Sequence, residues 1–456
     1  MKEGLKMSKE NIITSILMII IVIMLTLVST VDNSKDNKYY KITGSVLESN
    51  NDKVTLMDKN NIIYTFFSKD EFNAGDMLSV SYEGKINKNK NVQDATIISH
   101  KVIKETNAMP VIWNDNGMFK EFYNKAYNKL NKMTLDEKIG QLLLVRLPDN
   151  NMIDDVRKYK VGGYTLYKKD FDNKSKEEVI SMIDNLQKKS KIPLLIATDE
   201  EGGKVSRLSD NSNLVTAPFK SSSELYEEGG MELIKQDTIR KTDLLESLGI
   251  NINLAPVVDV STDPESYMFD RTLKQNTSTT SLYAKTVIES SLGSKVSYTL
   301  KHFPGYGNNS DTHTSSSTDN RTYSLLFEDD IPPFKAGIKA GAEAVLMSHN
   351  IVPALDKNSP VSLSINAHNV LRNELGFTGI IMTDDLDMKA VSSLNPYVNA
   401  IKAGNDLLLV TDYKKAFNDI KKAVNNKEIS KEQIDKLAFR VISWKYYKGL
   451  MYDMYK

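Results

Sequence analysis

The chain has 456 residues, and its 59 Lys and Arg balance its 59 Asp and Glu, so the formal net charge is zero. This balance leaves no broad positive surface, and no nucleic-acid partner is expected. The absence of cysteine excludes disulfides, thiolate metal sites and a cysteine nucleophile, and five histidines argue against a large imidazole metal cluster. The 40% of hydrophobic residues indicates a globular protein, and the length fits two to three domains or, equally, one large domain.

Residues 12–31 form an uncharged, apolar run of twenty residues. At about 1.5 Å per residue, a helix of this length spans a bilayer core of about 30 Å. Lys2, Lys6 and Lys9 precede the run and the following flank is neutral, which favours an N-terminus inside the cell and the remaining chain outside. The run is longer than a signal-peptide core and lacks a good cleavage site after it. Residues 1–38 are therefore predicted to be a cytoplasmic tip, a single-pass cell membrane anchor and a short linker, with a secreted, cleaved form as the alternative.

Residues 39–104 contain five short segments of β-forming residues, separated by turns rich in Asn, Gly and Asp. Segments of this length and spacing predict a small all-β domain, either a barrel or a sandwich. Oligosaccharide binding is compatible with such a module, but the sequence favours a spacer or packing role because it contains no readable aromatic platform. Residues 105–118, which include Pro110 and Gly117, are predicted to be a linker.

From residue 119 to residue 456, short apolar runs alternate with helical segments. Thr134 with Glu137, and Ser175 with Glu178, have the spacing of capping boxes that open helices. Eight apolar runs lie at 142–145, 162–167, 193–198, 251–258, 296–301, 342–347, 379–384 and 406–410. Eight βα units predict an α/β catalytic domain with a TIM-type (β/α)8 barrel. A doubly wound open sheet is the alternative, but no Gly-rich phosphate turn follows an early strand.

Polar and charged residues follow five of these runs at the point where each predicted strand ends. They are Asp199, Glu200 and Glu201; Asp259; Lys301 and His302; Ser348 and His349; and Asp384 and Asp385. In a barrel of this type the active groups lie just past the C-terminal ends of the strands. Any one of these residues could simply cap a helix or satisfy a loop, but the set as a whole predicts an active site.

A site that cleaves sugars needs an acid for the leaving oxygen and a group that meets the oxocarbenium-like carbon. Asp384 ends an apolar strand, which would aim its carboxylate into the barrel mouth, whereas Asp385 would point away and anchor the loop. Asp311 lies two residues before His313, and a carboxylate there can fix the imidazole tautomer and raise its basicity. Such a pair can transfer a proton near neutral pH, although the D-x-H pattern alone also fits a solvated loop histidine.

The run KHFPGYGNNSDTH at 301–313 resembles the signature of glycoside hydrolase family 3, and within it that of the bacterial β-N-acetylglucosaminidases or β-hexosaminidases. The resemblance covers most of residues 120–456. Its further segments lie at 133–145, 161–167, 197–208, 251–260, 379–388 and 400–410.

The resemblance implies a retaining exo-β-N-acetylglucosaminidase that needs no metal or organic cofactor. Asp384 would be the nucleophile that forms a glycosyl-enzyme, and His313, oriented by Asp311, would be the acid/base. The residues that would bind the hydroxyls of the terminal sugar are Asp199, Arg207, Arg271, Lys301 and His302. Together with the expected extracytoplasmic location, this makes N-acetylglucosamine-containing peptidoglycan fragments the expected carbohydrate substrate.

The sequence departs from the family pattern within the signature. Tyr306 stands where many relatives have His, and the segment from Gly307 to Asp311 is one residue shorter. TSSSTD follows His313 in place of a proline-containing stretch. The chain ends at Lys456, soon after the eighth βα unit, whereas β-glucosidases of the family usually take an acid/base Glu from an additional C-terminal domain. This difference favours N-acetylglucosamine over glucose.

Three alternatives stay open. A β-N-acetylglucosaminide phosphorylase would fit a histidine acid/base, because a neutral group tolerates anionic phosphate better than a carboxylate does. A substrate-assisted mechanism would use Asp384 and Asp385. An inactive, membrane-tethered cell-wall binding protein would have lost the nucleophile or the dyad, and the sequence retains both. The oligomeric state and the exact glycan are not predicted.

Overall fold

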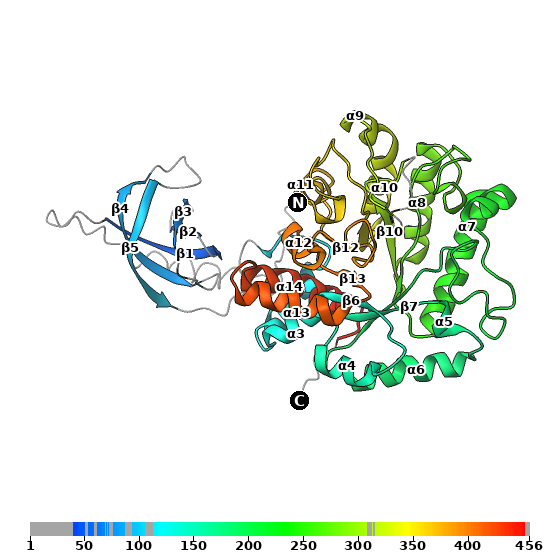
Figure 1. Ribbon diagram of the computed structural model, residues 1–456, viewed down its shortest axis with the longest axis horizontal. Helices are drawn as coiled ribbons and strands as arrows, with labels where there is room; N and C mark the ends of the chain where they lie inside the picture. Colours follow the sequence, from blue (N-terminus) through cyan, green and yellow to red (C-terminus); the bar gives the residue numbers. More distant parts are fainter. Residues whose placement is uncertain are drawn as a thin grey trace, which may run out of the picture. The chain divides into compact units, whose positions relative to one another are not determined.

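The computed structural model describes residues 40–451, except for gaps at 51–52, 59–61, 69, 71, 73–75, 87–93, 105–112, 308–311 and 313–314. The chain divides into two compact units between residues 114 and 115, inside the predicted linker (Figure 1). The predicted membrane anchor at 12–31 lies outside the described residues. Within the described ranges, no helix is both long enough and apolar enough to span a bilayer.

The first unit is a closed barrel of five strands in the order β1-β2-β3-β5-β4. The strands are β1 (Tyr40–Asn50), β2 (Lys53–Asp58), β3 (Ile63–Phe67), β4 (Met77–Lys85) and β5 (Asp94–Lys104). Neighbouring strands pair antiparallel, apart from a parallel junction between β3 and β5. The sequence prediction of a small all-β domain is confirmed, and the domain is a barrel rather than a sandwich.

The core of this barrel follows the two-residue period of its strands. Val54, Leu56, Tyr64 and Phe66 are buried and alternate with outward-facing residues on β2 and β3. Because successive side chains of a strand point to opposite faces, this alternation gives the small sheet one apolar face to close around.

The second unit contains eight parallel strands in the order β12-β11-β10-β9-β8-β7-β6-β13. The strands are β6 (Leu143–Arg146), β7 (Gly163–Leu166), β8 (Leu195–Thr198), β9 (Ile252–Asn253), β10 (Ser297–Phe303), β11 (Ala344–Met347), β12 (Ile380–Thr383) and β13 (Leu408–Val410). A bridge between Met382 on β12 and Leu407, just before β13, joins the first and last strands of this order, so the sheet forms a nearly closed barrel. All eight apolar runs of the sequence contain a strand, which confirms the predicted barrel.

One strand is much shorter than its apolar run. The run at 251–258 contributes only Ile252–Asn253 as β9 and then continues as a loop that forms a single bridge between Val257 and Lys301. Pro256 lies inside the run, and proline has no N–H to donate to a strand ladder.

Helices surround the strands of the second unit (Figure 1). They are α2 (Tyr123–Leu130), α3 (Leu135–Gln141), α4 (Met152–Tyr159), α5 (Lys168–Phe171), α6 (Lys176–Lys189), α7 (Ser222–Ser247), α8 (Thr277–Ser291), α9 (Tyr323–Leu325), α10 (Ile331–Ala340), α11 (Ile365–Asn369), α12 (Pro396–Ala403), α13 (Tyr413–Asn425) and α14 (Lys431–Tyr447). Short 3-10 or π turns lie at Lys120–Phe122, Phe269–Arg271, Leu326–Asp330, Val361–Leu363 and Val370–Glu374.

The two predicted capping boxes are confirmed. At the start of α3, Glu137 N donates to Thr134 Oγ1 at 3.3 Å, and Thr134 N donates to Glu137 Oε2 at 2.8 Å. Ser175 and Glu178 repeat this exchange at the start of α6, at 3.3 and 2.7 Å. Each box satisfies backbone N–H groups that a helix start leaves without partners.

Candidate active site

The predicted sugar-binding residues meet around one buried lysine at the C-terminal end of the barrel strands. Lys301, on β10, places its Nζ 2.8 Å from Asp199 Oδ1 and 2.6 Å from Glu201 Oε1, both of which follow β8. The side chain of Lys301 is only 3% exposed. Arg271 binds the same Glu201 through two bonds, Nη2 to Oε1 at 2.7 Å and Nε to Oε2 at 3.1 Å. Arg207 Nη2 lies 3.5 Å from Asp199 Oδ2.

These charges hold one another in the ionised state. Burial by itself would raise the pKa of the Glu201 carboxyl, but Lys301 and Arg271 lower it well below its usual range. Burial would likewise lower the pKa of Lys301, but Asp199 and Glu201 raise it above its usual value. The cluster therefore stays charged across the physiological range and presents fixed donors and acceptors at the barrel mouth.

Glu200 folds the loop that carries Arg207. Its buried carboxylate accepts hydrogen bonds from Ser206 Oγ at 2.8 Å, Ser209 Oγ at 2.8 Å, Arg207 N at 2.9 Å and Leu208 N at 3.0 Å. Four donors on one carboxylate fix the loop backbone on either side of Arg207. Among the described residues, the buried Nε of Arg207 has no hydrogen-bond partner.

Tyr167, the first residue after β7, lies between two guanidinium groups. Arg146 lies 4.4 Å and Arg207 lies 5.1 Å from the centroid of its ring. Burial and the nearby Asp199, Asp385 and Asp384 raise its pKa. The contact with Arg207 places Tyr167 beside the binding cluster.

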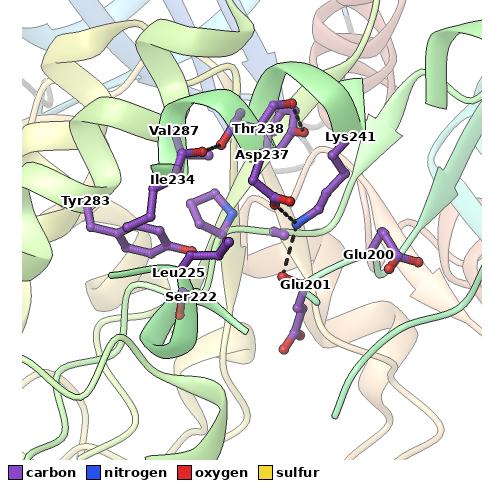
Figure 2. Close-up of a pocket in the computed structure, with 13 residues that line it drawn as sticks. Glu200, Glu201, Ser222, Leu225, Ile234, Asp237, Thr238, Lys241, Tyr283 and Val287 are labelled. Atoms are coloured by element: carbon purple, nitrogen blue, oxygen red, sulfur yellow. Dashed lines mark hydrogen bonds and ion pairs between the residues drawn. The ribbon is translucent and has the colours of Figure 1, made fainter. Parts of the chain in front are cut away.

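Lys241, on α7, supports the binding loop from outside the barrel (Figure 2). Its Nζ donates to the backbone oxygen of Glu201 at 3.2 Å and lies 3.3 Å from Asp237 Oδ2. A small cavity between the loop and helices α7 and α8 lies here, and Tyr283 lines it with these residues. The buried pair thus connects α7 to the backbone of the loop that carries Asp199 and Glu201.

His302 is oriented by Asp259, which follows β9. Its Nδ1 lies 2.8 Å from Asp259 Oδ2, and its backbone N donates to the same oxygen at 3.2 Å. A carboxylate oxygen accepts, so Nδ1 of His302 carries a proton toward Asp259. Nε2 lies 3.5 Å from Arg271 Nη2, which brings His302 into the binding cluster.

Asp384 follows β12 directly, as the sequence predicts. Its backbone N donates to Met347 O at 3.1 Å, and its Oδ1 accepts from Asp385 N at 2.8 Å. Burial would raise its pKa, but His349, His302, the Asp385 N–H and Lys301 together lower it below the usual value. The lowered pKa keeps the Asp384 carboxylate ionised at neutral pH.

Asp385 anchors the loop, which confirms its predicted role. Its Oδ1 accepts from Asp387 N at 3.0 Å and its Oδ2 accepts from Thr411 Oγ1 at 2.7 Å. Burial raises its pKa. With one oxygen bonded to its own loop and the other to Thr411 after β13, Asp385 is a support and not a second reacting carboxylate.

His349, after β11, contacts the same loop. Its Nε2 lies 2.9 Å from Asp385 O, and its Nδ1 lies 2.7 Å from Ser362 Oγ. The sequence marks His349, Asp259 and Glu201 as strand-end residues but assigns them no role, and it does not single out Tyr167. All four lie within three residues of a strand end or of a strand's extension, which is the signal that could have found them.

The predicted acid/base pair, Asp311 and His313, lies outside the described residues. Thr312, between them, is described and is buried. The structure therefore brings together the five predicted sugar-binding residues and places Asp384 directly after β12, and the dyad stays a prediction.

Comparisons with known proteins agree with this fold and site. The family model for the glycosyl hydrolase family 3 N-terminal domain matches residues 134–444. A β-hexosaminidase of Xylella fastidiosa (strain M23) is 29% identical over 314 residues, which cover 66% of this chain and 90% of that protein. A β-hexosaminidase of Xanthomonas campestris pv. campestris (strain B100) is 30% identical over 258 residues, 55% of this chain and 77% of that protein.

Solved structures agree as well. A family 3 β-N-acetylglucosaminidase from Paenibacillus sp. str. FPU-7 superimposes with a TM-score of 0.65 at 28% identity, covering 71% of this chain. This chain spans 64% of that protein, slightly less than two thirds of its length. A β-N-acetylhexosaminidase from Beutenbergia cavernae DSM 12333 gives a TM-score of 0.60 at 25% identity, covering 70% of this chain and 99% of that one. With a family model that spans nearly all of its barrel unit, this chain belongs to glycoside hydrolase family 3 and is a glycoside hydrolase.

Proposed function

We propose that the chain is a retaining exo-β-N-acetylglucosaminidase that releases terminal β-linked N-acetylglucosamine. The observation that carries the proposal is the Asp384 carboxylate directly after β12, whose pKa is lowered in part by Lys301 of the binding cluster. The relatives with the names β-hexosaminidase and β-N-acetylglucosaminidase support this substrate.

Asp384 would attack the anomeric carbon while the bond to the leaving oxygen breaks, giving a covalent glycosyl-enzyme. His313 would give its proton to the leaving oxygen and then take a proton from the water that releases the sugar. Two displacements at the same carbon retain the configuration. The roles of His313 and of Asp311, which would orient it, rest on the family resemblance of the segment at 301–313.

The binding cluster suits a neutral, hydroxyl-rich ligand. Lys301, Arg207 and Arg271 only donate hydrogen bonds, whereas Asp199 only accepts them. A sugar hydroxyl both donates and accepts, so it can lie between groups of the two kinds without adding net charge. The fixed geometry of the cluster would orient the terminal sugar with its anomeric carbon toward Asp384.

Peptidoglycan fragments are the proposed source of the sugar, and the cell membrane is the proposed location. The support for both is the apolar run at 12–31 with lysines before it. Fractionation of cells that express the full chain would test the location. Recovery in the cytosolic fraction would contradict it.

The experiment that tests the function compares the full chain with Asp384→Asn on an aryl β-N-acetylglucosaminide. We expect hydrolysis without phosphate and a loss of at least about 10³-fold in kcat for the variant, because the amide is not a nucleophile. Asp210→Asn is the matched control, because Asp210 is an exposed carboxylate in a surface ion pair with Lys168. The control should retain full activity.

Two outcomes would contradict the proposal. A rate that depends on phosphate and yields a sugar phosphate would identify a phosphorylase. A folded protein that releases no N-acetylglucosamine from aryl or glycan β-linked donors would not be this hydrolase.

A further inference from the structure

Tyr306 lies in the signature segment between two glycines and is buried. Its side chain packs with Val257 and Met268, and its backbone N donates to Asp259 Oδ1 at 2.7 Å. The other oxygen of Asp259 orients His302. The backbone of Tyr306 is therefore bonded to Asp259, the same carboxylate that orients His302 in the binding cluster.

The phenol hydroxyl of Tyr306 forms hydrogen bonds with Thr312. Thr312 N donates to the Tyr306 hydroxyl oxygen at 3.0 Å, and Thr312 Oγ1 lies 2.8 Å from that oxygen. The backbone and the side chain of Thr312 are thus both held by one buried hydroxyl group. Thr312 is the middle residue of the Asp311-Thr312-His313 segment.

The residue after Tyr306 is also confined. Gly307 has a φ of 57°, and a Cβ at this position would meet Arg321 Nη2 at 2.6 Å. Arg321 is held by Asp319, with Nε lying 3.0 Å from Oδ1 and Nη2 lying 2.6 Å from Oδ2. The backbone at Tyr306 is thereby packed on one side against an ion-paired arginine and bonded on the other to Asp259.

We propose that Tyr306 is a positioning residue for the acid/base pair, because its hydroxyl fixes Thr312, the residue that separates Asp311 from His313 in the sequence. Loss of this anchor is expected to slow the proton transfer that the proposed function assigns to His313. This inference rests on the proposed function, in which His313 transfers the proton. It gives a role to Tyr306, one of the positions where the sequence departs from the family pattern.

Tyr306 acts as a neutral hydrogen-bonding group. Burial and the nearby Asp384 raise its pKa to about 12, although its bonds with Thr312 oppose this rise. The phenol thus keeps its proton at neutral pH, and its oxygen can accept from Thr312 N while its O–H donates to Thr312 Oγ1. Tyr306 is not itself an acid or a base of the reaction.

The test compares Tyr306→Phe with the unaltered full chain on two donors. Chitobiose has a sugar leaving group that needs a proton, whereas 4-nitrophenyl β-N-acetylglucosaminide has an acidic leaving group that needs little help. We expect kcat/KM for chitobiose to fall about 10- to 100-fold, while kcat/KM for the aryl donor changes less than about threefold. Tyr298→Phe is the control, because the Tyr298 hydroxyl is equally buried but bonds Thr242 Oγ1 on α7 at 3.0 Å.

Amide hydrogen exchange gives a second readout that needs no activity. The peptide covering 304–318 should lose protection in Tyr306→Phe and keep it in Tyr298→Phe. Equal losses on both donors, or no loss on chitobiose, would overturn the inference, and so would unchanged exchange. If the unaltered chain turned over neither donor, the proposed function would fail, and exchange would still decide whether Tyr306 anchors Thr312.

Discussion

The two sides of the candidate site hold their charges in different ways. On the binding side, Lys301 contacts Asp199 and Glu201 directly, and Arg271 binds Glu201 through two bonds. On the side of the proposed nucleophile, no lysine or arginine among the described residues lies within ion-pair distance of Asp384, whose pKa is lowered by groups that act without such contact. A direct ion pair fixes the geometry of a carboxylate, but its oxygen is then already bonded to a cation. A carboxylate that attacks carbon must instead stay anionic and keep one oxygen free of a bonded cation.

Apart from the loss of the proposed nucleophile itself, the largest effect is expected where the binding side is broken. Lys301→Met would leave Asp199 and the buried Glu201 without their shared cation. Removing one partner of a buried ion pair costs about 3–5 kcal/mol, because the remaining charge stays desolvated. We expect the free energy of unfolding to drop by about this amount and kcat/KM to fall at least about 100-fold, as measured by denaturant titration and initial rates.

Lys168→Met is the matched control for Lys301→Met. Lys168 pairs with Asp210 at 2.7 Å, but both side chains are about half exposed. Surface pairs contribute about 0–1 kcal/mol, so this variant should lose little stability and no activity. Similar losses of stability and activity in the two variants would show that the buried ion pairs of the cluster contribute no more than a surface ion pair.

An intermediate effect is expected on the nucleophile side, in the pH profile. Because the pKa of Asp384 is lowered in the folded protein, its carboxylate stays ionised, and so competent to attack, to a lower pH than an ordinary aspartate. His349→Gln removes one cause of that lowering and keeps an amide that can donate to Asp385 O. The acid limb of kcat/KM should therefore move to higher pH, while the rate near neutral pH changes by only a few-fold.

His100→Gln is the control for His349→Gln, since His100 lies on β5 in the other unit. Its acid limb should coincide with that of the unaltered chain. An unchanged acid limb in His349→Gln, with Asp384 still required, would mean that the other groups alone keep the nucleophile ionised.

The sequence predicts the strands of both units and the positions of Asp384 and Lys301, because these depend on local patterns. Apolar runs of about four residues become strands buried on both faces, and a polar residue just past such a run lies at the barrel mouth. For the same reason the loop-anchoring role of Asp385 follows from the alternation along a strand.

The partners across the barrel could not be predicted in this way. Arg271 meets Glu201 from 70 positions away, and Lys301 meets Asp199 from 102 positions away. Which of three consecutive acids, Asp199, Glu200 and Glu201, turns toward the cluster depends on the loop after β8. Glu200 turns inward to Ser206 and the backbone of its own loop, and nothing in the sequence separates it from Glu201.

The smallest effect is expected at Lys241, which contacts the backbone of the binding loop and not the cluster side chains. Lys241→Met removes the bond from its Nζ to Glu201 O and its pairing with Asp237, but leaves the contacts of Lys301 and Arg271 in place. Losing a buried hydrogen bond costs about 1–3 kcal/mol of stability. If the bond also positions the loop, KM should rise about three- to tenfold with kcat nearly unchanged. Lys241→Arg, which keeps the charge and the donors, should restore most of the KM. A Lys241→Met variant that melts at a lower temperature, but keeps the original KM well below that temperature, would show that Lys241 stabilises the unit without positioning the loop. The fixed geometry of the binding side would then depend on its own ion pairs alone.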